Sequence, residues 1–259
     1  MNIRLGGILL ALQIASLPAL AQVGHEVYSN PTLQAANRNA NANVADFSDY
    51  FRVNAGATYT NIGSIYWLNT NTTGTFISNG LYTTGATATD YFGNGTARQA
   101  MEINGSLAPL FNNLVFQNGA MNIANSDGIT VNRTLTLTNG ITTTQRNSPL
   151  ANSIRVNTAS AGAITGDFSD TRHVDGYVSR VMNANTTYDF PVGNAGDYRP
   201  LTYRPTAAAT FVSVAYQQGT PSQGVTSLGT GVFGGKYGRQ LARSRGRTRS
   251  SDRFDSGCN

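Results

Sequence analysis

The chain runs Asn113-Leu-Val-Phe-Gln117, Gly128-Ile-Thr-Val-Asn132, Thr134-Leu-Thr-Leu-Thr138 and Ser153-Ile-Arg-Val-Asn157 within one stretch of 45 residues. Each segment alternates apolar residues with Thr, Asn or Arg. Turn-forming residues such as Asn118-Gly119 and Asn139-Gly140 separate them. A repeat of two residues predicts β-strands with one buried side and one solvent-facing side.

Similar segments occur on both sides of this stretch, and the interval from Leu135 to Ile154 to Val174 is about 20 residues. Short strands at such intervals predict the coils of a parallel β-helix-like solenoid over residues 46–172. In that fold Leu, Ile, Val and Phe point inward, while Thr and Asn form outward ladders. An antiparallel β-sandwich remains the alternative, because tight Asn-Gly turns favour hairpins.

The composition supports an all-β fold class. Only 12% of the residues are charged, which is about half the usual share. Glu26 and Glu102 are the only glutamates and Lys236 is the only lysine, so strong helix formers are scarce. The net charge of +5 comes entirely from residues 236–259, which carry seven basic and two acidic side chains. The body is neutral, which argues against a nucleic-acid partner.

The first 21 residues have the order of a secretory signal peptide: Arg4, an apolar run, Pro18, and the cleavage pattern Ala19-Leu20-Ala21. Residues 22–45 are rich in Asn and Ala and are predicted to be a flexible lead-in. After signal removal no segment is apolar enough to span a membrane. Cys258 is the only cysteine, so an intrachain disulfide is excluded and stability must come from burial and hydrogen-bond ladders.

Beyond residue 172 the pattern changes to a meander, and residues 173–231 are predicted to begin an antiparallel β domain. Its sequence contains Asp175-Gly-Tyr-Val-Ser-Arg-Val181, Tyr188-Asp-Phe-Pro-Val-Gly193 and Asp197-Tyr-Arg-Pro-Leu201. This combination resembles a pattern in large exported, adhesin-like surface proteins of Bacteroidetes, over about residues 110–216. The resemblance implies an extracellular β-rich architecture and cargo of type IX secretion. It implies no catalytic residues.

The last part of the chain departs from that group. Residues 232–259 lack strand alternation and are predicted to be a basic, disordered tail. Members of the group continue with further β domains, so the chain is expected to be a truncated or frameshifted member. The alternative for the tail is a basic anchor for acidic glycans or nucleic acid.

One acidic cluster is a candidate site. Asp167, Asp170 and Asp175 lie close together in sequence, with His173 between them. Carboxylates at this spacing can bind Ca²⁺ or serve as acid and base on a glycan, but a solvated turn between strands, in which Asp accepts turn hydrogen bonds, is the favoured interpretation. The tetrapeptide Asp-Phe-Ser-Asp also occurs at residues 46–49 without a histidine, which favours a structural unit.

Other constellations are weaker. The mature chain has only His25 and His173, and no nucleophile elbow or zinc-ligand spacing is present, so no catalytic residue and no cofactor is predicted. Trp67, Tyr66 and Tyr59 are candidates for a sugar-stacking platform, but core or strand-pair positions are favoured for them.

The sequence therefore predicts a non-catalytic structural or adhesive protein, secreted or at the outer cell surface. The expected partner is a surface glycan or another surface protein, contacted by neutral Thr and Asn side chains with avidity from repetition. The alternatives are a carbohydrate-active enzyme on a β-helix, acting as a polysaccharide lyase or hydrolase, and a non-functional gene fragment. The sequence identifies neither the ligand nor the oligomeric state.

Overall fold

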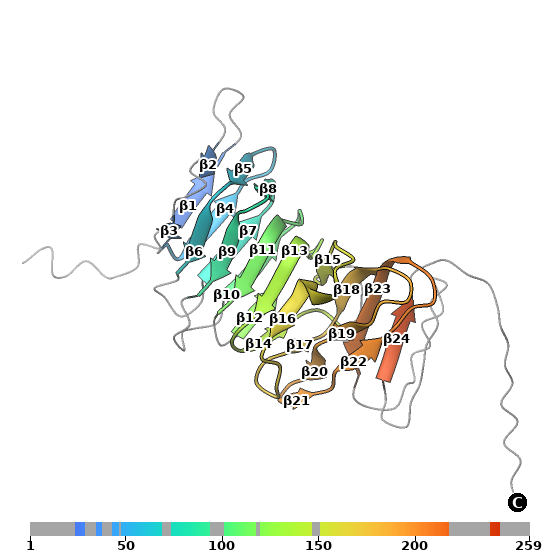
Figure 1. Ribbon diagram of the computed structural model, residues 1–259. Helices are drawn as coiled ribbons and strands as arrows, with labels where there is room; N and C mark the ends of the chain where they lie inside the picture. Colours follow the sequence, from blue (N-terminus) through green and yellow to red (C-terminus); the bar gives the residue numbers. More distant parts are fainter. Residues whose placement is uncertain are drawn as a thin grey trace, which may run out of the picture.

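The computed structural model describes residues 24–28, 35–37, 43–46, 48–68, 74–93, 101–117, 120–146, 151–217 and 239–243. These residues form two large sheets along which the chain winds in successive coils (Figure 1). Nearly all strand pairs up to β18 are parallel, and each coil contributes to both sheets. The predicted β-solenoid is confirmed, with about five turns, and the sandwich alternative is wrong because its strands would pair antiparallel.

Each sheet collects strands from successive coils. The nine-stranded sheet contains, in order, β1 (Gly24–Val27), β4 (Tyr50–Val53), β7 (Gly74–Ser78), β10 (Met101–Gly105), β12 (Ala120–Ile123), β14 (Ile141–Thr143), β17 (Val174–Asp175), β20 (Val192–Asn194) and β21 (Asp197–Tyr198). The thirteen-stranded sheet contains β2 (Ala35–Asn37), β3 (Asn43–Asp46), β5 (Thr58–Asn61), β6 (Ser64–Trp67), β8 (Leu81–Thr84), β9 (Thr89–Phe92), β11 (Leu110–Phe116), β13 (Ile129–Leu137), β15 (Ile154–Val156), β16 (Ile164–Gly166), β18 (Val178–Met182), β23 (Ala209–Tyr216) and β24 (Arg239–Arg243). A small third sheet pairs β19 (Tyr188–Phe190) with β22 (Leu201–Tyr203), and one 3-10 turn spans Ala161–Ala163.

The register places like residues above one another. Phe51 pairs with Phe76, Phe76 with Ile103, and Ile103 with Ile123, which gives coils of 20 to 27 residues along this column. The column points inward, because alternate residues of each strand are buried, as in the pattern of β13. Side-chain alternation therefore sets which residues reach the core.

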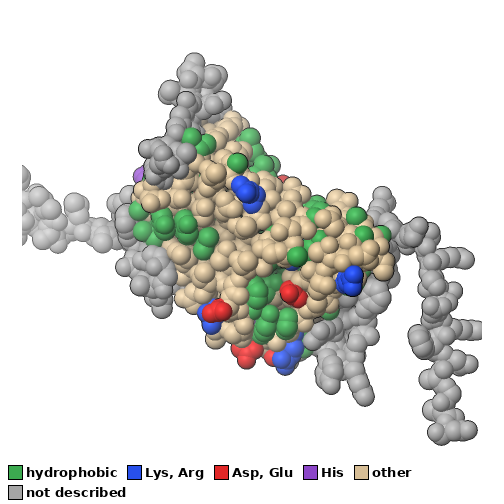
Figure 2. All heavy atoms as spheres, viewed as in Figure 1, with side chains coloured by type: hydrophobic (Ala, Val, Ile, Leu, Met, Phe, Trp, Pro, Cys, Tyr) green, Lys and Arg blue, Asp and Glu red, His purple; other side chains and the backbone are tan. Residues whose placement is uncertain are grey.

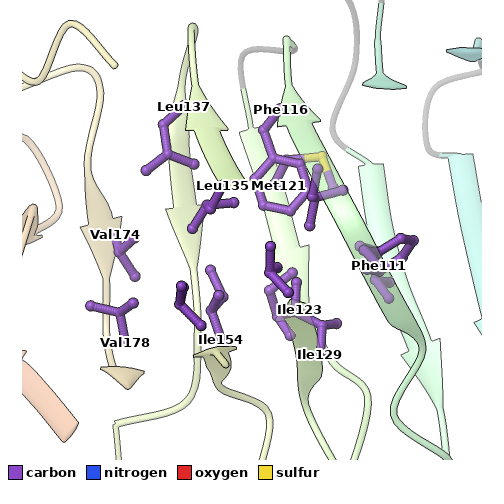
Figure 3. Packing of buried hydrophobic residues seen from close by; sticks show 14 of the residues in the cluster. Phe111, Phe116, Met121, Ile123, Ile129, Leu135, Leu137, Ile154, Val174 and Val178 are labelled. Atoms are coloured by element: carbon purple, nitrogen blue, oxygen red, sulfur yellow. The ribbon is translucent and has the colours of Figure 1, made fainter. Parts of the chain in front are cut away.

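The core lies between the two sheets and changes character along the stack. The first coils bury aromatic rings (Phe51, Trp67, Phe76, Tyr82, Phe92, Phe111 and Phe116). Figure 3 shows the later coils, where mostly branched aliphatic side chains such as Ile129, Leu135 and Ile154 fill the same space. Burial of these side chains is the main source of stability in a chain without a disulfide between its coils.

The turns use Asn and Gly to seal the stack. Asn125 is fully buried, and its Nδ2 donates to the carbonyl oxygens of Asn104 and Leu107 of the preceding coil, each at 3.0 Å. Gly105 has φ +114°, and a Cβ there would lie 2.2 Å from the carbonyl oxygen of Ser78. The abundant Asn therefore serves buried turns as well as the outward ladders that the sequence predicts.

Antiparallel strands close the C-terminal end of the stack. β23 pairs antiparallel with β18, β21 with β20, and β22 with β19. Parallel pairing nevertheless continues through β17, β18 and β20, past the boundary predicted at residues 172–173. The strands β21 and β23 extend the two solenoid sheets, whereas β19 and β22 form the small third sheet, and none of these antiparallel pairs starts at that boundary.

Two further boundaries change. Residues 22–45, predicted as a flexible lead-in, contain β1, β2 and part of β3, which form the first coil on β4, β5 and β6. The predicted disordered tail contains β24, which pairs with β23.

The signal peptide predicted at residues 1–21 lies outside the described residues. The described part of the chain contains no helix long and apolar enough to cross a membrane.

Candidate functional site

A pair of tyrosines stands out on the outer side of the thirteen-stranded sheet. The rings of Tyr66 on β6 and Tyr91 on β9 are stacked, with centroids 4.3 Å apart and planes 4° apart. The two residues are in register in a parallel pair, which places their side chains one strand spacing apart on the same side. Both side chains are half-buried and reach solvent.

Polar side chains continue the same surface beside the tyrosines. Ser64 pairs with Thr89, Thr89 with Asn113, and Asn113 with Thr134. The Thr134 hydroxyl donates to Asn113 Oδ1 at 2.9 Å, and one strand further Thr136 and Thr165 hydroxyls lie 3.0 Å apart. We call the tyrosine face the set Ser64, Tyr66, Thr89, Tyr91, Asn113, Val115, Thr134 and Thr136.

The tyrosine face contains no charged side chain. Figure 2 shows that most of the viewed surface is neither charged nor hydrophobic, and that hydrophobic side chains gather over β6 and β9. The pKa of Tyr91 is raised, first by partial burial and then by the neighbouring Tyr66. The phenol of Tyr91 therefore stays a neutral hydrogen-bonding group at physiological pH.

The other two aromatic candidates lie in the core. Trp67 is buried, with its indole edge-on to Phe76 at 5.2 Å, and its Nε1 donates to Asp90. Tyr59 is half-buried and stacks on Tyr82 at 5.5 Å. Of the three aromatic candidates, only Tyr66 faces outward, and its stacking partner Tyr91 was not among the candidates.

The three aspartates of the predicted calcium site have different partners. Asp167 is exposed and pairs with Arg172 at 3.5 Å. Asp170 Oδ1 accepts from the Tyr198 amide at 2.9 Å. Asp175 pairs with Arg146 and its Oδ2 accepts from the Ala195 amide at 2.8 Å. Across the residues that the structure describes, no group of three or more Asp, Glu, His or Cys side chains could hold a metal ion.

His173 lies inside the protein and not on a surface beside these aspartates. It is fully buried, its Nδ1 lies 3.0 Å from the Ser169 carbonyl oxygen, and Nε2 has no partner. A Cβ on Gly193 would lie 2.6 Å from that Nε2, so the backbone of β20 covers the ring. A buried imidazole of this kind does not reach a substrate.

Two buried charged residues were missed by sequence reasoning. Asp90 is fully buried on β9, at an inward position between Ala88 and Phe92. Arg180 is fully buried on β18 and donates to the carbonyl oxygens of Asp189, Ser160 and Ala161. Both residues could have been identified from the sequence, because each is a charged residue at an inward position of a strand whose other inward positions are apolar.

The N-terminal end of the stack carries a depression of about 550 Å³. Its lining combines inward residues of the first coils, among them Val27, Phe51 and Tyr59, with the pair His25–Asp46 at 2.8 Å. These lining residues belong to β1, β3, β4 and β5, in the first described coils of the stack.

No protein-family model, no curated protein and no solved structure matches this chain.

Proposed function

We propose that the protein is a non-catalytic, exported surface protein that contacts uncharged glycan through the tyrosine face. The observation that carries the proposal is the in-register stack of Tyr66 and Tyr91 within a set of outward residues, none of which is charged. Aromatic side chains that reach solvent offer an apolar ring with a polar tip, which suits the apolar ring faces and hydroxyl edges of sugars.

Among the described residues, the register leaves one face of the tyrosine stack open. Ala45 on β3 pairs with Tyr66, and its methyl group occupies the next strand position beyond the tyrosine ring. Strands lie about 4.8 Å apart, so a methyl group there covers little of a phenol ring. On the other side Val115 follows Tyr91. The free face of Tyr66 is therefore the place for a sugar ring, with Ser64 beside it.

Neutral neighbours favour an uncharged ligand. Hydroxyl and amide groups of Ser64, Thr89 and Asn113 can both donate and accept hydrogen bonds, as sugar hydroxyls do. A charged ligand would gain no compensating charge from the eight residues of the tyrosine face. Each contact is weak, and affinity in such a protein comes from repeated contacts along an extended ligand.

Binding to neutral polysaccharides tests the proposal. Retardation of the protein in gels that contain plant or algal glucans, mannans or galactans gives an association constant. This constant should fall at least about tenfold in Tyr66→Ala, which corresponds to the loss of about one good contact. Tyr50→Ala is the matched control, because Tyr50 is a half-buried tyrosine on the outer side of the nine-stranded sheet. Equal retardation of both variants and the wild type would reject the tyrosine face as the binding surface.

The same incubation distinguishes binding from catalysis. A non-catalytic protein releases no new reducing ends from any of these polysaccharides. Release that is lost in Asp170→Ala would identify a carbohydrate-active enzyme on a β-helix instead.

Export to the cell surface is the second part of the proposal. Its support is the order of charge, apolar run and cleavage pattern in residues 1–21, and the resemblance of residues 110–216 to exported adhesin-like proteins. Fractionation of cells that express the whole chain, with and without residues 2–21, tests it. The complete chain should appear processed outside the cytoplasm and the shortened chain should stay inside.

A further inference from the structure

A carboxyl group lies within the aromatic core of the first coils. Asp90 on β9 occupies an inward column in which its register partners are Ile65 on β6 and Leu114 on β11. Its side chain has no solvent exposure. A carboxyl in this position is costly as an ion, because the surrounding medium cannot replace its hydration.

Three donors from three strands converge on one oxygen of this carboxyl. Tyr82 donates its hydroxyl at 2.5 Å, Trp67 its indole Nε1 at 3.1 Å, and Asn61 its Nδ2 at 3.4 Å, all to Oδ1. Asp90 Oδ2 is buried and has no partner. A neutral carboxyl carries its proton on Oδ2, since Oδ1 already accepts three hydrogen bonds.

The groups that face Asp90 do not neutralise a negative charge. The titratable ones are Tyr82 on β8 and Tyr59 on β5, whose own pKa values are raised, in each case first by burial and then by Asp90. Asp46 on β3 acts on Tyr59 as a further negative charge. None of the core side chains contributed by β6, β7 and β11 is charged; they are Ile65, Trp67, Phe76, Phe111, Leu114 and Phe116.

The pKa of Asp90 follows from this environment. Burial raises it, and the three hydrogen bonds lower it in part, with a result of about 7. The carboxyl therefore changes its charge near neutral pH, inside a packed core.

We propose that Asp90 is a proton-dependent clasp: as a neutral carboxyl it ties β5, β6 and β8 together, and as an ion it loosens the first three coils. The coils concerned are formed by β1 to β9. The inference is independent of glycan binding, because it concerns the inner side of β9 and not the tyrosine face.

The sign of the pH dependence follows from linkage. The unfolded chain releases the proton near pH 3.8, whereas the folded chain keeps it until about pH 7. The contribution of Asp90 to the free energy of unfolding is largest below pH 3.8 and decreases as the pH rises from 3.8 to about 7. Above about pH 7 the contribution no longer changes. Between pH 5 and pH 7 the unfolding constant should rise about tenfold per pH unit, or about a hundredfold in all.

Thermal unfolding of the full chain between pH 5 and pH 8 tests the clasp. The wild-type melting temperature should fall by about 5 to 10 °C over this range. Asp90→Asn, a neutral isostere that keeps an acceptor for the three donors, should lose this fall. Asp127→Asn is the control, because Asp127 is exposed in a turn, and it should follow the wild type. An Asp90→Asn variant with the wild-type pH slope would overturn the proposal.

Hydrogen exchange of the wild type gives a second test that needs no variant. After correction for intrinsic exchange rates, the opening constant of amides in β8 and β9 should be about a hundredfold larger at pH 8 than at pH 5. The increase over the same pH range should be smaller for amides in β13. This result supports the clasp even when Asp90→Asn does not fold. Unchanged opening of β8 and β9 over the same range would overturn it.

Discussion

The guanidinium of Arg180 lies 4.7 Å from the ring centroid of Tyr188, inside the C-terminal end of the stack. Arg180 is fully buried and has no carboxylate among its hydrogen-bond partners; it donates to backbone carbonyl oxygens instead. Burial lowers its pKa to about 10, so the group remains charged at physiological pH. One arginine thereby joins β18, the small third sheet and the 3-10 turn.

Replacement of this arginine should destabilise the C-terminal end. Arg180→Met keeps much of the length but removes the guanidinium that donates to the carbonyls of Ser160, Ala161 and Asp189, so the free energy of unfolding should fall by about 3 kcal/mol or more. Urea denaturation measures it. Arg199→Met, at a half-exposed ion pair with Asp197, should cost less than about 1 kcal/mol. Equal losses in the two variants would contradict the role given to Arg180.

Inward and outward neighbours on one strand should respond differently to truncation. The Phe76 ring lies 4.9 Å from that of Tyr82 and 5.2 Å from that of Trp67, whereas Ile77 points outward and is half-buried. Phe76→Ala should cost about 3–5 kcal/mol and Ile77→Ala about 1 kcal/mol or less. Denaturation of both variants compares them directly, and a larger loss in Ile77→Ala would mean that the strand has the opposite orientation.

The turn at Gly105 should tolerate no side chain. Its φ of +114° and the 2.2 Å approach of a Cβ to the Ser78 oxygen predict that Gly105→Ala destabilises by at least about 2 kcal/mol. Gly162→Ala is the matched control, because a Cβ there meets nothing within 4 Å, and its effect should stay within about 0.5 kcal/mol. Thermal unfolding of the two variants measures the difference. A stable Gly105→Ala variant would show that the coil connection can relax.

The melting temperature in about 5 mM Ca²⁺ should equal the melting temperature in a chelator within about 1 °C. A bound ion would raise it, because binding to the folded state stabilises that state by mass action. The physical reason for the equality is that Asp167, Asp170 and Asp175 contact Arg172, the Tyr198 amide and Arg146, respectively. A rise in melting temperature that disappears in Asp175→Asn would instead show a metal site formed by rearrangement.

The acidic cluster illustrates what sequence spacing leaves open. Asp170 and Asp175 are five positions apart, but their partners Tyr198 and Arg146 come from residues 28 ahead and 29 behind, respectively. These partners reach the two aspartates only because the chain returns to the same part of the stack in the neighbouring coils. Proximity in sequence therefore did not produce a shared site.

The tyrosine face shows the opposite case. Core or strand-pair positions were favoured for both Tyr66 and Trp67, and in the structure Trp67 lies in the core whereas Tyr66 lies in a strand pair on the outer side. The stacking of Tyr66 on Tyr91, however, needs a coil of 25 residues between them, and the coil length varies along the chain with its turns. Thus the kind of position was predictable from the sequence, and the stacking partner of Tyr66 was not.

The amino-acid sequence by itself determined the all-β class, the inward and outward sides of most strands and the solenoid as the favoured architecture, because a repeat of two residues is a local property of the chain. Tertiary structure alone decided which coil lies on which, where the parallel stack ends, and which groups surround Asp90 and Arg180. Those relationships depend on register between strands about 20 to 30 residues apart, and register is set by packing of whole coils and not by any short segment.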